Sequence, residues 1–335
     1  MVLVTGGTGL VGAHLLLRLV EKGDSVRAIH RTGSNLERVK KVFGYYCENA
    51  NELFEKIEWI EADLNDIPKL EIAFESITHV YHAAALISFD PSNYKKLQKV
   101  NTEGTANIVN LCIANCIEKL GYVSTIGAIG KSPEGVKADE ENEWTPQEAN
   151  VYGLTKHAAE MEVWRGSQEG LDIVMLNPGV IIGPGFWDTG SGALFTIAKK
   201  GHSYYPPGGT GFVTVHDVVR LLIQLTESSV KNERFITVAQ NLTYLEILTK
   251  IAIEFGLKPP KRQLKFWQLE IGRWVDWLKH LITKKGRRIT KSSIRSLKQR
   301  QIFDSRKVKR ALHFQFEPLE DVIAFSCRKF EQENP

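Results

Sequence analysis

Short apolar runs alternate with amphipathic helical patterns along the first half of the chain. The apolar runs lie near residues 2–5, 25–30, 57–62, 78–84, 119–125 and 171–177, and the helical patterns lie near 10–22, 68–76, 92–117 and 150–169. This alternation predicts an α/β fold, a doubly wound parallel sheet whose right-handed crossovers place helices on both faces. Ligands bind at the carboxyl ends of the strands in such folds, so the residues after each strand are the candidates for chemistry.

A glycine-rich turn follows the first predicted strand. Gly6, Gly9 and Gly12 separate the apolar run Val2 to Val4 from the helical pattern Leu10 to Lys22. We expect positive φ at Gly6 and Gly9, so that a pyrophosphate can approach backbone N–H groups, and close packing of helix and strand at Gly12. Glycine turns also occur where a chain merely bends, but this context favours a dinucleotide site. The residues of the turn predicted to bind it are Gly6, Thr8, Gly9, Leu10, Val11 and Gly12.

The end of the second predicted strand bears on the choice of cofactor. The strand ends in His30 and Arg31 and carries no acid, whereas NAD sites use an acid there to bind the ribose. The planar, permanently charged fork of arginine suits a 2′-phosphate, which favours NADP(H) over NAD(H). The alternative is that Arg31 is an ordinary solvated charge, which leaves NAD open. After the third strand, Asp63 and Leu64 are candidates for the edge and face of an adenine.

A tyrosine and a lysine one helical turn apart are the candidates for acid/base chemistry. Tyr152 and Lys156 lie at i and i+4, so both project from one face of the predicted helix. A nearby ammonium is expected to lower the pKa of the phenol, which could then exchange a proton with an alcohol or ketone oxygen. Thr125, or alternatively Ser124, ends the fifth strand and offers a hydroxyl to the same oxygen. A tyrosine and a lysine at this spacing are common on protein surfaces. The prediction of acid/base chemistry therefore depends on their occurrence together with the glycine turn.

The motifs TGGTGLVG, YHAAA, VNTEGTANIV, YVSTIGAIG, YGLTK and LNPGVIIGPG, in this order, resemble the extended short-chain dehydrogenase/reductase superfamily, that is, the NAD-dependent epimerase/dehydratase family. The resemblance runs from residue 1 to about residue 255. It implies a dinucleotide-binding fold with a carboxyl-terminal substrate lobe, and catalytic roles for Thr125, Tyr152 and Lys156. It also implies a place for Asn101 below the site and a structural role for Asp217. The further cofactor contacts that it implies are Ala83, Ala84, Ala85, Ser124, Tyr152, Lys156, Pro178, Gly179, Val180 and Ile181.

The resemblance also implies a division of the chain. A Rossmann domain is expected over residues 1–180, with 211–240 returning to it, and a substrate-binding lobe over 181–210 and 241–335. Asn177 before Pro178 and the missing acid after the second strand resemble the branch of dihydroflavonol and cinnamoyl-CoA reductases and 3β-hydroxysteroid dehydrogenases. This favours NADP(H)-dependent reduction of a carbonyl in a small-molecule substrate, or the reverse oxidation. The alternatives are a nucleotide-sugar epimerase or dehydratase with tightly bound NAD, and a cofactor-binding regulator without catalysis.

The composition of the chain indicates the cellular compartment in which we expect the protein. The 335 residues are 43% hydrophobic, enough for a sizeable core, and neither a membrane-spanning run nor a signal peptide is recognised, so a cytoplasmic protein is expected. The four cysteines lack metal-ligand spacing, and neither a metal site nor a disulfide is expected. We expect a monomer or a homodimer.

The carboxyl-terminal third is strongly basic and rich in tryptophan. Residues 258–310 hold 18 Lys and Arg but three acids, and Trp267, Trp274 and Trp277 lie at helical spacing within them. The simplest interpretation is a lobe helix whose apolar face packs on the core. A second interpretation is peripheral membrane contact through residues 264–291, as basic amphipathic helices with tryptophans can lie on anionic bilayers. No nucleic-acid-binding motif accompanies the charge, so no nucleic-acid partner is expected.

Overall fold

A seven-stranded parallel sheet forms the centre of the molecule. The computed structural model describes residues 1–133, 135–283, 287 and 290–334. The strand order is β11-β7-β5-β4-β1-β2-β3, and every neighbouring pair is parallel. The predicted doubly wound α/β fold is therefore confirmed. The strands are β1 (Val2–Thr5), β2 (Val26–His30), β3 (Ile57–Glu61), β4 (His79–His82), β5 (Lys119–Val123), β7 (Ile173–Pro178) and β11 (Glu233–Thr237).

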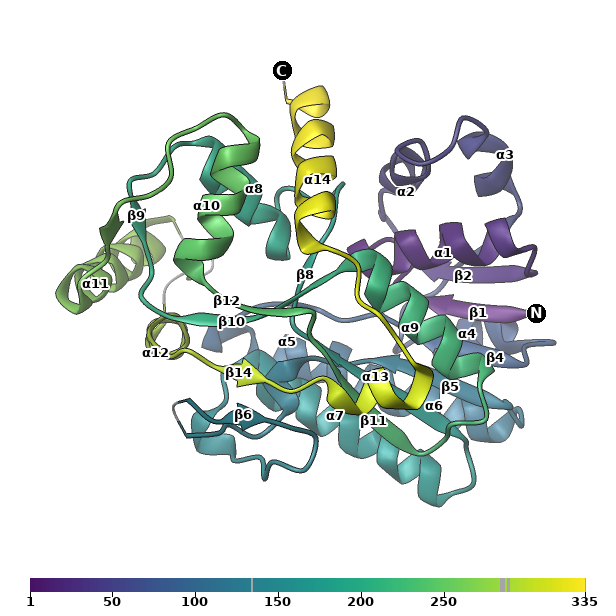
Figure 1. Cartoon of the computed structure of the whole chain (residues 1–335). Helices are drawn as coiled ribbons and strands as arrows, with labels where there is room; N and C mark the ends of the chain where they lie inside the picture. The colour runs from purple at the N-terminus through teal and green to yellow at the C-terminus, as the bar shows by residue number, and fades with distance from the viewer. Residues whose placement is uncertain (134, 284–286, 288–289, 335) are drawn as a thin grey trace.

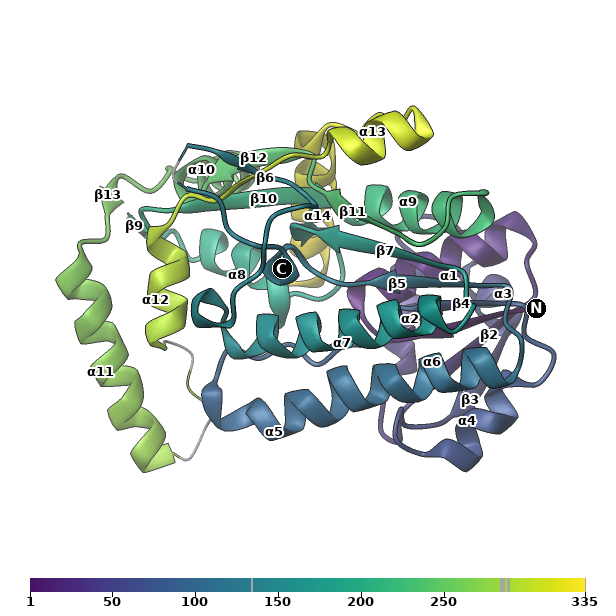
Figure 2. The ribbon, with the colours of Figure 1, turned by 90° about the horizontal axis from the view of Figure 1, so that it is seen from below.

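Helices cover both faces of this sheet, because each crossover returns the chain to a parallel strand (Figure 1). One layer contains α1 (Leu10–Lys22), α2 (Leu36–Phe43), α3 (Ala50–Glu55) and α9 (Val215–Glu227), and these pack in one apolar core. The opposite layer contains α4 (Ile67–Phe74), α6 (Gly104–Ala114) and α7 (Val151–Gln168), which pack in a second core. Figure 2 shows α6 and α7 side by side beneath the strands.

The long helix predicted over residues 92–117 contains a π-helical segment. A short 3₁₀ turn, η1 (Pro91–Asn93), leads into α5 (Tyr94–Leu97), which continues through a π-helical segment, η2 (Gln98–Glu103), into α6. Asn101 lies in the π segment, with 1% of its surface exposed. Segments of this kind are rare and are frequent at functional sites, because they turn a side chain out of the regular helical register.

A smaller lobe adds a second sheet and further helices whose bounds the sequence pattern did not predict. The sheet contains β8 (Val180–Ile182), β10 (Gly209–Thr214) and β12 (Gln240–Thr243), and β10 runs parallel to β8 and antiparallel to β12. Two-stranded pairs join β9 (Tyr204–Tyr205) to β13 (Arg262–Gln263) and β6 (Lys137–Ala138) to β14 (Ile302–Phe303). The helices are α8 (Ala193–Lys199), α10 (Tyr244–Glu254), α11 (Phe266–Thr283), α12 (Lys291–Lys298) and α14 (Leu319–Glu333).

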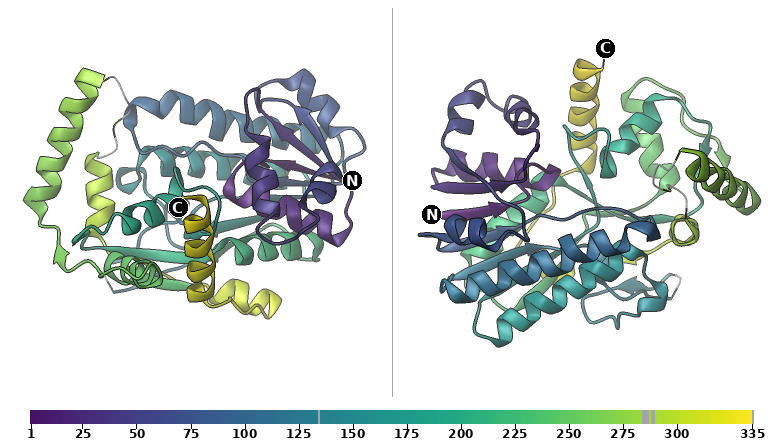
Figure 3. Two further views of the ribbon diagram at one scale, coloured as in Figure 1. Left: turned by 90° about the horizontal axis from the view of Figure 1, so that it is seen from above. Right: turned by 180° about the vertical axis from the view of Figure 1, so that it is seen from behind.

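The last helix, α14, links the lobe to the first half of the chain (Figure 3). Its residues Leu319, Val322 and Ile323 pack with α8 and α10 in the core of the lobe. On the other side the Phe325 ring packs at a tilt of 34° against Tyr46, with ring centroids 5.3 Å apart. Between β14 and α14 the short helix α13 (Arg306–Leu312) packs against β11, so the carboxyl-terminal segment returns to the central sheet before it enters the lobe.

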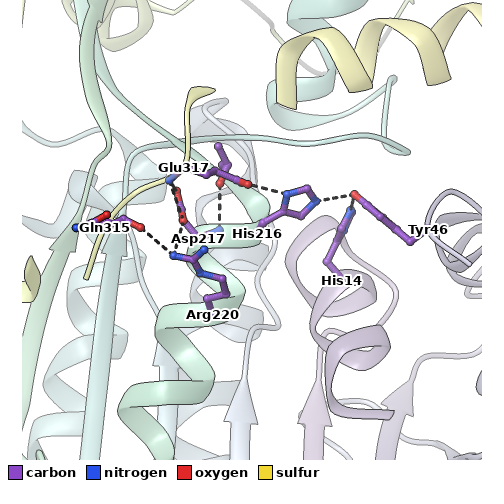
Figure 4. Close-up of polar contacts among 8 residues, drawn as sticks. His14, Tyr46, His216, Asp217, Arg220, Gln315 and Glu317 are labelled. Atoms are coloured by element: carbon purple, nitrogen blue, oxygen red, sulfur yellow. Dashed lines mark hydrogen bonds and ion pairs between the residues drawn. The ribbon is translucent and has the colours of Figure 1, made fainter. Parts of the chain in front are cut away.

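A network of polar side chains connects α1, α9 and the segment before α14 (Figure 4). The Tyr46 hydroxyl lies 3.0 Å from Nε2 of His14 and 2.8 Å from Nε2 of His216, and Nδ1 of His216 lies 3.0 Å from a Glu317 carboxylate oxygen. Asp217, whose side chain is fully buried, accepts the Glu317 backbone N–H at 3.1 Å.

Hydrogen bonding assigns the protons along this network. Nδ1 of His14 lies 2.8 Å from the Leu10 carbonyl and must therefore donate. Burial lowers the pKa of His14 to about 3, so the ring is neutral and its Nε2 accepts from the Tyr46 hydroxyl. The Tyr46 oxygen then accepts from Nε2 of His216, which leaves Nδ1 of His216 facing Glu317.

Candidate active site

In the glycine turn the backbone that follows β1 lies very close to the backbone that follows β4. Gly6 has a φ of +73°, and a Cβ there would lie 2.5 Å from the backbone nitrogen of Ala84. A Cβ on Gly12 would lie 2.1 Å from the Gly6 carbonyl oxygen, so α1 can start here only without that side chain. The prediction for Gly9 is wrong in one respect: its φ is −103°, in the extended region, because it acts as the N-cap of α1. Gly9 therefore does not need the left-handed conformation.

The structure brings the ends of β1 and β4 together above this turn. Ala83 and Ala84 follow β4 directly, and the Ala84 N–H donates to the Thr5 hydroxyl at 3.3 Å. Of the remaining turn residues, Thr8, Leu10 and Val11 are half-buried at the start of α1, while Ala85 is exposed. The turn and the strand end thus form one continuous backbone surface at the carboxyl edge of the sheet.

A buried histidine that was not predicted from the sequence lies beneath this surface. Nδ1 of His82 lies 2.6 Å from the Thr5 hydroxyl, and Nε2 lies 2.9 Å from the hydroxyl of Thr105, which itself donates to the Asn101 carbonyl at 2.6 Å. Nε2 of His82 must therefore carry the proton, and Nδ1 accepts from Thr5. Burial, together with the charge of Lys156, lowers the pKa of His82 to about 3, which agrees with a neutral ring.

Tyr152 and Lys156 lie in the first two turns of α7. The helix begins there because the Asn150 side chain caps it, accepting the Gly153 N–H at 2.8 Å. Lys156 is 1% exposed, and its ammonium donates to the Tyr122 hydroxyl at 2.6 Å and to the Val123 carbonyl at 2.8 Å. Burial lowers the pKa of Lys156 to about 7, although the nearby charge of Glu160 opposes this.

The environment of Tyr152 differs from the expectation drawn from its spacing. Its half-buried ring meets Phe89 edge to face, with centroids 5.9 Å apart. Burial raises the pKa of the Tyr152 phenol above its ordinary value, whereas a lowered pKa was expected. The Lys156 hydrogen bonds are directed to β5 rather than to Tyr152, so loss of hydration dominates at the phenol.

Thr125 is held at the end of β5 by its neighbours. Its hydroxyl accepts the Gly127 N–H at 3.2 Å and caps the 3₁₀ turn η3 (Ile126–Ala128). Its carbonyl accepts from the Asn177 side-chain amide at 3.0 Å, and the same amide donates to the Glu160 carboxylate at 2.6 Å. Ser124 is 4% exposed, next to Thr125.

The Glu160 carboxylate is the second feature that was not anticipated from the sequence. It is fully buried one helical turn beyond Lys156, and Arg234 of β11 lies 3.5 Å from its other oxygen. Burial raises the pKa of Glu160, while the nearby Ser124 side chain, the charge of Arg234 and the hydrogen bond from Asn177 oppose the rise. The spacing of Glu160 four residues after Lys156 would have placed it on the same helical face.

Arg31 follows β2 and is exposed at the same edge of the sheet. In the part of the chain that the structure describes, its guanidinium makes no ion pair. One carboxylate near the end of β2 comes from β3, where Glu61 accepts from the Thr32 hydroxyl at 2.9 Å. Asp63 accepts the Asn65 N–H at 3.0 Å, and Leu64 is 7% exposed and packs on α6.

The remaining predicted contacts lie where β7 passes into β8. Pro178 ends β7, Gly179 connects the strands, and Val180 and Ile181 are half-buried in β8. A Cβ on Gly179 would lie 2.4 Å from the Gly211 carbonyl oxygen, so this crossing also depends on a missing side chain. The crossing directs the chain from the central sheet into the lobe.

A cavity of about 150 Å³ lies between the end of β5, the start of α7 and the lobe. Ile126 and Asn150 line it, next to Thr125 and close to Tyr152 in sequence, although neither Thr125 nor Tyr152 is itself among the lining residues. The lobe contributes Tyr244 and Phe303 among others. Trp144 also lines the cavity and stacks on His157, with ring centroids 3.7 Å apart. The lining also includes Lys131, Gln299 and Gln301, so the cavity combines aromatic and polar side chains.

Neither a metal cluster nor a bilayer-crossing helix occurs in the described part of the chain. Among the residues with a described position, no group of three or more His, Cys, Asp or Glu side chains could hold a metal ion. Within the described ranges, none of the helices combines the length and the hydropathy that crossing a bilayer would need.

Comparison with known proteins identifies the family. The sequence model of the NAD dependent epimerase/dehydratase family matches residues 2–238. A putative dihydroflavonol 4-reductase of Synechocystis sp. is 30% identical over 283 residues, covering 82% of this chain and 78% of that protein. Sterol demethylase protein B of Methylococcus capsulatus is 30% identical over 260 residues, 74% of each chain.

Solved structures agree in fold. The crystal structure of gox2253 is similar with a TM-score of 0.83 at 26% identity, over 99% of this chain and 98% of that one. UDP-glucose 4-epimerase of Thermus thermophilus, in complex with NAD, is similar with a TM-score of 0.75 at 23% identity, over 98% of each chain. The protein is thus an NAD(P)-dependent enzyme of the reductase and epimerase type. The chain belongs to the NAD dependent epimerase/dehydratase family, within the extended short-chain dehydrogenase/reductase superfamily.

Proposed function

We propose that this protein is an NADP(H)-dependent oxidoreductase that reduces a carbonyl group of a small, lipophilic substrate. Tyr152 acts as the proton donor, Thr125 hydrogen-bonds the same oxygen, and Lys156 supports the cofactor ribose and the charge of the site. The observation that carries the choice of NADP(H) is the exposed Arg31 at the end of β2, beside the glycine turn and with no acid in its own strand.

The cradle for the dinucleotide fits this proposal. Gly6 and Gly12 keep the start of α1 free of side chains, so its N–H groups are accessible to a pyrophosphate. Ala83, Ala84 and Ala85 offer small side chains beyond β4, and Pro178 to Ile181 flank the opposite side. Asp63 and Leu64 follow β3, where an adenine would lie. The bound cofactor supplies the hydride.

Burial of Tyr152 favours the reductive direction. Reduction of a carbonyl adds a hydride to carbon and a proton to oxygen, so the side chain that serves the oxygen must begin protonated. A phenol whose pKa is raised by burial is protonated at neutral pH. Lys156 lies one helical turn from Tyr152, so its positive charge opposes the negative charge of the phenolate that the reaction leaves. Thr125 stabilises the developing charge on the oxygen.

The aromatic and aliphatic part of the cavity lining supports a substrate with an apolar ring system. Ile126, Trp144 and Phe303 contribute apolar surface to a volume of about 150 Å³. The relatives at 30% identity are named for a dihydroflavonol and a sterol, both ring-bearing alcohols or ketones. We therefore propose that the substrates of this protein are hydrophobic ketones that contain a ring system.

One observation favours a second function, epimerisation or dehydration of a nucleotide sugar with tightly bound NAD. Glu61 places a carboxylate near the end of β2, where an NAD ribose could use it. Such an enzyme returns its hydride within each cycle, so it consumes no cofactor. Purified protein that retains NAD and turns over a nucleotide sugar without net oxidation would establish this second function instead.

We assign cofactor binding to residues 1–180 with 211–240, and substrate binding to 181–210 and 241–335. The placement of α9 and β11 against β7 supports the first assignment, and the cavity lining from Tyr244 to Phe303 supports the second. We further propose that the chain works in the cytoplasm as a monomer or homodimer. Sedimentation equilibrium of the purified chain tests the oligomeric state.

The deciding experiment compares the binding of NADPH and NADH by nucleotide fluorescence. Arg31→Ala should weaken NADPH binding by about 10- to 100-fold, since it removes a charge-assisted bond to phosphate, and should leave NADH binding nearly unchanged. Arg262→Ala removes an equally exposed arginine of the lobe and serves as the control. Equal losses for both nucleotides would reject the assignment of Arg31 to the 2′-phosphate.

A further inference from the structure

Helix α11 presents an apolar face that no other described part of the chain covers. The exposed fractions are 58% for Trp267, 53% for Ile271, 54% for Trp274 and 44% for Val275. These positions recur at spacings of three and four residues and therefore lie on one side of the helix. Leu269 lies on the opposite side and is 7% exposed. Among the described side chains of this helix, most of the large apolar ones therefore face away from the protein, which is the reverse of a core helix.

The helix lies at the margin of the molecule, where Figures 1 and 2 both show it outside α12. Trp274 and Trp277 meet edge to face at 5.6 Å, and Arg273 lies 5.0 Å from the Trp274 ring centre. The Lys298 ammonium of α12 lies 3.8 Å from the ring centre of Phe266, which is itself 53% exposed. Cationic groups thus border the apolar face.

The charge around this face decides which partner fits it. Residues 261–300 contain 13 Lys and Arg against two acids, and Lys261, Arg262 and Lys265 at the start of the helix are exposed. A second copy docked through the same face would bring this positive charge against itself. An anionic bilayer offers the opposite charge, an apolar interior for the aliphatic side chains and an interface that suits tryptophan.

We propose that α11 docks the protein on the surface of anionic membranes, with Trp267 and Trp274 inserted at the interface. The docking face comprises described residues only, and residues 284–286 and 288–289 of the basic cluster in the sequence lie outside them. Helix α11 packs on α12, and Ser296 of α12 lines the cavity beside the candidate catalytic residues. Docking would therefore hold that cavity close to the bilayer. Delivery of a lipophilic ketone from the membrane rests on the proposed function, whereas docking itself does not.

Co-sedimentation of the full chain with lipid vesicles tests the docking. We expect retention on vesicles of phosphatidylcholine mixed with phosphatidylglycerol, loss of retention in high salt, and little retention on phosphatidylcholine alone. The double variant Trp267→Gln/Trp274→Gln should reduce partitioning by more than about tenfold, as it removes two inserted aromatic side chains. The matched control is Ile72→Gln/Ile253→Gln, which replaces side chains that are 55% and 59% exposed on α4 and α10, and it should bind as the unchanged protein does.

Two further measurements distinguish insertion of the tryptophans into the bilayer from unfolding or self-association of the variant. Quenching of tryptophan fluorescence by brominated phosphatidylcholine in the anionic vesicles should occur in the unchanged protein and be reduced in the tryptophan double variant. Thermal unfolding followed by circular dichroism should give equal midpoints for the two, because the replaced side chains are exposed.

Four outcomes bear directly on the docking. Equal retention on neutral and anionic vesicles, or full retention of the double variant, would overturn the proposal. A dimer that dissociates in the double variant, with no vesicle binding by either protein, would identify a second copy as the partner and also overturn it. Loss of vesicle binding in the double variant with unchanged NADPH affinity would support docking and leave the proposed function untouched.

Discussion

The ammonium of Lys156 donates a 2.6 Å hydrogen bond to the hydroxyl of Tyr122 and lies 4.2 Å from the centre of the same ring. This contact ties α7 to β5 directly beneath the candidate active site. Since Lys156 is 1% exposed, its charge is stabilised by few groups: the Tyr122 hydroxyl, the Val123 carbonyl and, one turn along the helix, the Glu160 carboxylate. The site therefore contains a lysine whose protonation depends on pH in the neutral range.

Lys156→Met should change how stability depends on pH. The pKa of Lys156 falls from 10.5 to about 7 on folding, so between these values the unfolded chain binds more protons than the folded one. The stability of the unchanged protein should therefore rise with pH across this window relative to the variant, by about a few kcal/mol in total. Urea unfolding at pH values across the window measures the difference. Lys96→Met replaces an exposed lysine and should give a difference that does not vary with pH; the same flat result for Lys156→Met would contradict the buried ammonium.

Tyr152→Phe should abolish turnover and leave cofactor binding intact. Removal of a general acid typically lowers the rate by about 10² to 10⁴-fold, while the ring and its contact with Phe89 remain. NADPH oxidation with a panel of hydrophobic ketones measures turnover, and nucleotide fluorescence measures binding. Tyr204→Phe, at a position that is 41% exposed in the lobe, is the control. Turnover that survives in Tyr152→Phe would require a different proton donor.

Gly12→Ala and Gly9→Ala should differ sharply in stability. A Cβ on Gly12 would lie 2.1 Å from the Gly6 carbonyl oxygen, so the start of α1 must move to accept it. A Cβ on Gly9 would meet the same oxygen at 3.4 Å, and the φ of −103° at Gly9 is allowed for any residue. Thermal midpoints measured without cofactor should therefore fall strongly for Gly12→Ala and slightly for Gly9→Ala. The reverse order would mean that the turn has a different backbone path.

Tyr46→Phe should destabilise the connection between α1, α9 and the carboxyl-terminal segment. The change leaves Nε2 of His14 without its donor and Nε2 of His216 without its acceptor. Unpaired buried polar groups cost about 1–3 kcal/mol each, and chemical denaturation should show a loss of this order. Tyr94→Phe, at a position that is 42% exposed, should be nearly neutral. A similarly small effect for Tyr46→Phe would argue against the proton assignment along the network.

The sequence predicted the doubly wound sheet well because its signals are local. The strand runs near 57–62 and 119–125 appear as β3 and β5, and the glycine turn appears between β1 and α1. The helix predicted over 92–117 is present as α5, η2 and α6, but the sequence did not predict its π segment, in which Asn101 donates to the Leu86 carbonyl and the Thr155 hydroxyl. In the lobe the sequence predicted the helix that carries Trp267 and Trp274, but not the strands β8, β10 and β12, which contain three, six and four residues and pair across long separations.

Local patterning by itself determined the class of the fold, the glycine turn and the positions of the residue types that can carry the chemistry, because hydrophobic period and backbone freedom are properties of short segments. Only the tertiary structure decided how the charged and titratable side chains of the site affect one another. Whether Lys156 lowers the pKa of Tyr152 depends on where its ammonium hydrogen-bonds, and it bonds to β5. Whether tryptophans at helical spacing form core or surface depends on what covers them, and Trp267 and Trp274 are left exposed. Burial and charge pairing join residues far apart in the chain, so no local pattern can encode them.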